Sequence, residues 1–126
     1  MYSKKGFGGP KVILPEGFAL IDKSPEFLAI SPEGVRMRVR NMDNYPEKSA
    51  GFWQKTLFAY LGERGYIPMG ETTELDFGEA PFSVHHWGVP YGNEDYIYIS
   101  GIRLKGNKIE LLEIAGPAQH VGEYFP

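Results

Sequence analysis

Two adjacent histidines, His85 and His86, are the residues of this sequence best suited to binding a metal ion. Consecutive residues of a β-strand point to opposite faces of a sheet, so a regular strand brings only one of them to a given ion. A mononuclear site would need one of them together with His120 and a carboxylate such as Glu79 or Glu123. Because the sequence has no cysteine, only histidines and carboxylates are available for such a site. The simpler interpretation is a solvent-facing histidine on an edge strand.

Three arginines alternate with apolar residues over residues 35–41, which predicts a half-buried strand. Arg36, Arg38 and Arg40 then form a basic stripe on one face, in steps of about 7 Å along the strand. Such a stripe could dock an acidic protein, an anionic ligand or lipid headgroups. The alternative is the ordinary wet face of an antiparallel sheet, with acidic neighbours such as Glu110 on an adjacent strand.

An aromatic group in the second half of the chain offers a recognition surface, because its rings combine an apolar body with a polar tip. Its members are Trp87, Tyr91, Tyr96 and Tyr98. The same residues would also suit a second small core beneath the N-terminal segment. The loop at 88–95 is the best candidate for a functional loop, since a rigid hairpin would present it.

Catalytic and phosphate-binding motifs are missing from the sequence. Ser31, Ser49 and Ser100 occupy turn, helix-start and bulge positions, and none stands in a G-x-S-x-G sequence. The glycine-rich residues 6–9 lack the Lys-Ser/Thr pair of a phosphate-binding loop. We therefore expect no cofactor and a binding function in place of catalysis. The alternative is a small protein that uses histidines and carboxylates as a metal site or a hydrolase.

The charge and the hydropathy of the sequence restrict the classes of partner that the protein can bind. Lys and Arg number 13 against 16 Asp and Glu, and the net charge of -3 argues against a nucleic-acid-binding protein. No apolar run approaches the ~20 residues of a transmembrane helix. The partner is then a protein or a small molecule. Met1 is either the natural start or a start that replaces an export segment, which would make the protein cytoplasmic or periplasmic and envelope-associated respectively.

Hydrophobic periodicity predicts strands first and then a long helix. Short strands are expected at 18–21 and 27–30, joined to the strand at 35–41 by hairpin turns. A helix is expected over 45–63, where Asn44 and Glu47 resemble a capping box. Its apolar face, which includes Trp53, Leu57 and Leu61, would pack on one face of the sheet.

The residues after this helix predict strands and a final short helix near Pro117. The segment 82–89 has prolines at both ends, so it is expected either at a sheet edge, where it offers a homodimer interface, or as a strand whose prolines are confined to its limits. A bulge at Ser100-Gly101 would turn the apolar residues on both sides of it toward one core. The fold class is α+β, with an antiparallel sheet in one domain over 11–126, preceded by a flexible leader at 1–10.

Three short motifs resemble the Mog1/PsbP-like superfamily: the sequence FLAISPEGV at 27–35, EKS at 47–49 at the opening of the helix, and IELLEIAGP at 109–117. The resemblance implies an antiparallel sheet flanked by helices, in a protein with an accessory, assembly or binding role. Bacterial members include many small envelope lipoproteins, although this sequence has no cysteine to carry a lipid. The superfamily has no shared catalytic residues, so the resemblance implies a non-enzymatic protein.

Overall fold

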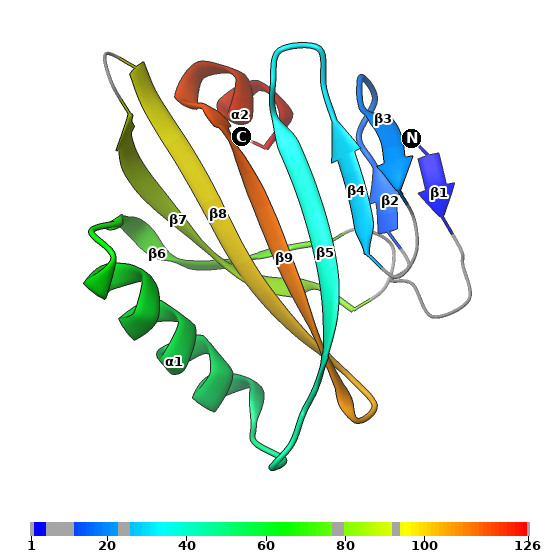
Figure 1. Ribbon diagram of the computed structural model, residues 1–126, viewed down its shortest axis with the longest axis vertical. Coiled ribbons are helices and arrows are strands. Elements are labelled where there is room, and N and C mark those ends of the chain that lie inside the picture. The colour runs from blue at the N-terminus through cyan, green and yellow to red at the C-terminus, as the bar shows by residue number, and fades with distance from the viewer. Residues whose placement is uncertain (1, 5–11, 23–25, 77–79, 92–93, 126) are drawn as a thin grey trace.

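Seven antiparallel strands form the main sheet of this protein, in the spatial order β3-β4-β5-β9-β8-β7-β6 (Figure 1). The computed structural model describes residues 2–4, 12–22, 26–76, 80–91 and 94–125. Its elements are β1 (Tyr2–Lys4), β2 (Val12–Leu14), β3 (Ala19–Asp22), β4 (Phe27–Ile30), β5 (Arg36–Asp43), α1 (Ala50–Glu63), β6 (Ile67–Leu75), β7 (Phe82–Tyr91), β8 (Glu94–Lys105), β9 (Lys108–Pro117) and α2 (Ala118–Tyr124). The expected α+β class, with a long helix and a short C-terminal helix, is confirmed.

Turn chemistry joins neighbouring strands as the sequence predicts. Between β4 and β5 the Ser31 amide donates to the Val35 carbonyl, and Gly34 closes the turn at a φ of 92° that favours glycine. Between β8 and β9 the turn is centred on Gly106, whose φ is 60°, and Lys105 faces Lys108. These two hairpins fix the registers of β4 with β5 and of β8 with β9.

The long helix begins five residues later than expected. Ser49 is its N-cap, and its hydroxyl accepts a hydrogen bond from the Phe52 amide at 3.2 Å. The expected capping box is wrong because Asn44 makes other bonds. Its side chain accepts from the Lys48 amide and donates to the Lys48 carbonyl, which closes residues 44–48 into a turn before the helix. The same carboxamide oxygen accepts the indole N–H of Trp53 at 2.9 Å and so ties the turn to the helix.

The sheet carries an apolar cluster on each face, and this explains why both odd- and even-numbered positions of β8 are apolar. The first face carries the main core, in which Ile99 and Ile114 pack with Val121 and Phe125 from α2 and its C-terminal end. The second face carries a smaller cluster of Ile102, Ile109 and Leu111, against which α1 places Trp53 and Leu57. The expected bulge at Ser100-Gly101 is wrong, because β8 pairs with β9 without a register shift. Ile99 and Ile102 instead serve opposite cores.

The order of the strands also corrects the expected edge. The segment 82–89 belongs to β7, which pairs with β6 on one side and with β8 on the other. The edges of the sheet are β3 and β6, so the expected edge position of 82–89 is wrong. Of the expected leader, residues 2–4 form β1, paired with β2, and residues 1 and 5–10 lie outside the described residues. In the described part of the chain, neither helix is long and apolar enough to cross a membrane.

Candidate functional site

A groove opens on the second face of the sheet, beside the area that α1 covers. Its volume is about 290 Å³, and we call it the cationic groove. It is lined by Glu26, Leu28, Arg36, Arg38, Tyr98, Glu113 and Ala115, which come from β4, β5, β8, β9 and the residue before β4. The sheet register explains its shape. Ala115 lies between Arg36 on one neighbouring strand and Tyr98 on the other, and its methyl group leaves the space between them open.

Glu113 is the common acceptor of this groove. Its Oε1 accepts from Arg38, with Nε at 3.0 Å and Nη2 at 2.8 Å, and it lies 3.0 Å from Nη2 of Arg40. Its Oε2 accepts from the Tyr98 hydroxyl at 2.7 Å. The side chain of Glu113 is only 17% exposed, whereas that of Arg38 is 40% exposed. One carboxylate therefore holds two of the three arginines of the stripe in place.

Arg36 differs from the other two arginines. It is exposed and lines the groove, and it forms no ion pair with any described residue. Glu26 is the remaining acid of the groove, with its Oε1 4.0 Å from Nη1 of Arg38. The predicted stripe is thus present on one face of β5, but its acidic neighbour is Glu113. Glu110 points to the opposite face, where it is buried in an ion pair with Arg103.

Tyr98 forms one wall of the groove and stays a hydrogen-bond donor. Burial raises the pKa of its hydroxyl far above the usual range, and the adjacent Glu113 carboxylate raises it further. Its ring meets Tyr66 edge to face at a centroid distance of 5.2 Å. Tyr96 lies on the same face one pair further along β8, opposite Pro117 and Val89, and is half-buried outside the groove lining.

Trp87 lies beside Tyr98 across the sheet and is fully buried, so it cannot touch a ligand in the groove. Its indole N–H donates to the Ser100 hydroxyl at 2.9 Å. The element above it is α1, through Phe58 at a centroid distance of 4.9 Å. The second core expected beneath the N-terminal segment therefore lies beneath α1. Tyr91 ends β7, and its side chain lies outside the described part of the structure, as do residues 92–93 of the expected loop.

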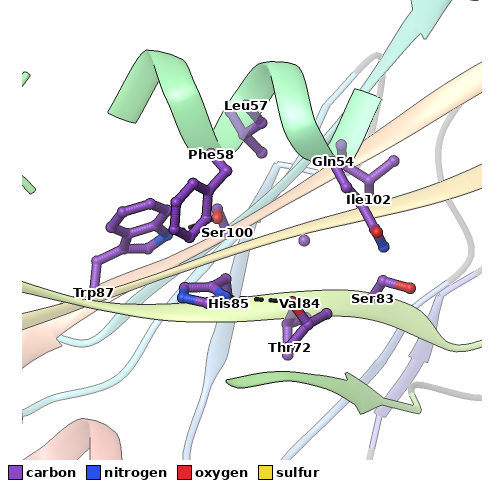
Figure 2. A pocket seen from close by; sticks show the side chains of 11 residues that line it. Gln54, Leu57, Phe58, Thr72, Ser83, Val84, His85, Trp87, Ser100 and Ile102 are labelled. Atoms are coloured by element: carbon purple, nitrogen blue, oxygen red, sulfur yellow. Dashed lines mark hydrogen bonds between the residues drawn. The ribbon is translucent and has the colours of Figure 1, made fainter. Parts of the chain in front are cut away.

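A second and much smaller cavity lies between α1 and β7, with a volume of about 30 Å³ (Figure 2). Figure 2 shows Leu57 and Phe58 reaching down from α1 toward His85 and Trp87. The Nδ1 atom of His85 lies 3.4 Å from the Thr72 hydroxyl, and its buried Nε2 has no hydrogen-bond partner among the described residues. Burial lowers the pKa of His85. The space fits about one water molecule and no larger ligand.

The histidines named as metal candidates do not come together. His85 faces α1, and His86 points to the opposite face of the sheet, as adjacent strand residues must. His120 lies on α2, with Nδ1 3.3 Å from Oε1 of Glu123. Glu79 falls outside the described residues. Across the described ranges, no group of three or more histidines and carboxylates is arranged to hold a metal ion.

Sequence reasoning missed four residues of the groove lining: Glu26, Leu28, Glu113 and Ala115. The turn at Gly106 places residue 113 opposite residue 100, and this register can be counted from the sequence. The pairing of β5 with β9, which brings Glu113 beside Arg38, joins segments about seventy residues apart and has no local signal. A scan against protein-family models and a search of curated proteins both find no match for this chain.

Proposed function

We propose that this protein is a non-enzymatic binding module and that the cationic groove is its ligand site. The observation that carries the proposal is the guanidinium of Arg36, which forms no ion pair with any described residue and lies in a concave site whose other charged groups are mostly paired with one another. A volume of about 290 Å³ lies near the lower limit of small-molecule sites. The ligand is therefore a small molecule with an anionic group.

The hydroxyl groups of the three candidate nucleophiles already form structural hydrogen bonds, which favours a binding function over hydrolysis. The Ser31 hydroxyl accepts from the Val35 amide, Ser49 caps α1, and the Ser100 hydroxyl accepts from Trp87. Each is used by the fold, and Ser31 and Ser100 are buried. The resemblance of the sequence to the Mog1/PsbP-like superfamily, with its accessory and binding proteins, supports the same proposal.

The test is a small-molecule screen by two-dimensional ¹H–¹⁵N NMR on the whole chain. We expect ligands that shift the amide signals of β5, β8 and β9. Ala115→Leu should abolish these shifts, because the larger side chain fills the groove between Arg36 and Tyr98 without changing any charge. Ala59→Leu adds the same side chain at an exposed position of α1 and should leave binding intact. Ligands that bind both variants equally would show that the groove is not the site.

A further inference from the structure

The residues of the cationic groove also define the chemical class of its ligand, if the proposed function holds. We infer that the ligand is a small monocarboxylate with an apolar body. Its carboxylate pairs with Arg36, and its apolar part lies over Ala115 between Leu28 and the ring of Tyr98. The inference rests on three observations: the state of Arg36, the charge balance of the groove and the nature of its walls.

Arg36 is the one arginine of the stripe with a guanidinium available to a ligand. Arg38 is fixed on Glu113 by two hydrogen bonds, and Arg40 is paired with the same carboxylate oxygen. Arg36 is exposed and makes no ion pair within the described ranges. The parallel N–H groups of a guanidinium match the two oxygens of a carboxylate, so a carboxylate can bind it in a bidentate manner.

The charge balance of the groove favours a single negative charge on the ligand. The lining itself carries Arg36 and Arg38 against Glu26 and Glu113, and Arg40 pairs with Glu113 from outside the lining, so the whole cluster has three arginines, two acids and one net positive charge. One carboxylate neutralises it. A phosphate monoester or a dicarboxylate would bring a second negative charge into a groove that already contains two carboxylates, and the repulsion would weaken binding.

The walls of the groove favour an apolar body. Leu28, Ala115 and the ring of Tyr98 line it between the charged groups, and Leu28 lies opposite Arg38 across the β4–β5 pair. A small inorganic anion would leave this apolar surface in contact with water. A ligand with several methylene groups covers it, and each buried methylene should improve the dissociation constant by roughly two- to fourfold.

The test is a set of NMR titrations with six-carbon compounds that differ in charge and with one shorter monocarboxylate. The probes are butyrate, hexanoate, hexanol, adipate and hexyl phosphate, at about pH 8, where the phosphate carries two negative charges. We expect hexanoate to bind about tenfold more tightly than hexanol, adipate or hexyl phosphate, and more tightly than butyrate. Arg36→Gln should weaken hexanoate binding about tenfold and leave hexanol binding unchanged.

Lys55→Gln is the matched control, because it removes one positive charge from an exposed position of α1 and should not change hexanoate binding. The amide fingerprint of each variant reports whether it is folded. The inference is overturned if hexyl phosphate or adipate binds as tightly as hexanoate, if chain length has no effect, or if none of the probes binds. The proposed function fails separately, if the wider screen finds no ligand that Ala115→Leu excludes.

Discussion

Replacing Glu113 by glutamine tests whether this carboxylate holds the arginine stripe in place. The substitution keeps the shape of the side chain and removes its charge, which leaves Arg38 and Arg40, neighbours on one face of β5, without their shared counter-ion. Two partly exposed ion pairs are worth about 1 kcal/mol together. The hydrogen bond from the half-buried Tyr98 hydroxyl loses a charged acceptor, which costs up to about 1 kcal/mol more. We expect the free energy of unfolding to fall by between about 1 and 2 kcal/mol.

Urea denaturation followed by tryptophan fluorescence measures this change. With a denaturant slope of about 2 kcal/mol per molar, the midpoint should fall by about 0.5 to 1 M. Glu26→Gln is the control, because it makes the same chemical change in the same groove at a single 4.0 Å contact between exposed side chains. That variant should shift the midpoint by less than about 0.2 M. Equal shifts for the two variants would refute the special role assigned to Glu113.

Three further predictions concern the core, pH and backbone packing. Ser100→Ala leaves the buried Trp87 indole N–H without its acceptor and should lower the free energy of unfolding by about 1 to 2 kcal/mol in urea; no loss would contradict the bond. Burial lowers the pKa of His85 in the folded protein below its ordinary value of 6.5, so at mildly acidic pH the unfolded chain binds the proton more tightly than the folded one. The free energy of unfolding should therefore fall as the pH falls below about 6.5. His85→Phe should reduce this dependence when urea midpoints at about pH 7.5 and 5.5 are compared, and an unchanged dependence would point to another group. Gly101→Ala would place a methyl group 2.7 Å from a valine methyl of β7 and should destabilise the fold by about 1 to 3 kcal/mol. Gly122→Ala has open space on α2 and should be neutral or stabilising in thermal unfolding, so similar results for these two glycines would refute the packing argument.

Local patterns predicted the elements of this fold well. The alternation around Arg36–Arg40, the turn at Gly106 and the apolar spacing of Trp53 and Leu57 each depend on residues close in sequence. The predicted start of the long helix was wrong because Asn44 and Ser49 are both suitable N-cap residues. Asn44 fits a capping pattern, yet its carboxamide bonds to Lys48 and Trp53, and Ser49 takes the cap.

The pairing of strands that are distant in the sequence could not be predicted, and this pairing determines which residues come together in the groove. The sequence predicts Arg36 and Arg38 as binding residues and, under the alternative of an ordinary solvent-facing strand, offers Glu110 as an example of an acidic neighbour, because the register of β5 with β9 has no local signal. Glu110 and Glu113 lie three positions apart on β9 and therefore point to opposite faces, which is why Glu110 is buried on the face of the main core and Glu113 lies in the groove. The order of the strands also has no local signal, so the expected edge position of residues 82–89 is wrong. The expected bulge at Ser100-Gly101 assumed a single core, whereas the sheet has a core on each face.

The groove and the main core lie on opposite faces of the same sheet, so the residues that line one do not pack in the other. Along β5, the even-numbered Arg36 and Arg38 reach the groove, while the odd-numbered Met37 and Val39 fill the main core on the far side. Substitutions at groove positions therefore leave the interior packing unchanged. If the groove binds the proposed ligand, substitutions at Leu28, Arg36 or Ala115 should change its specificity with little loss of folding stability.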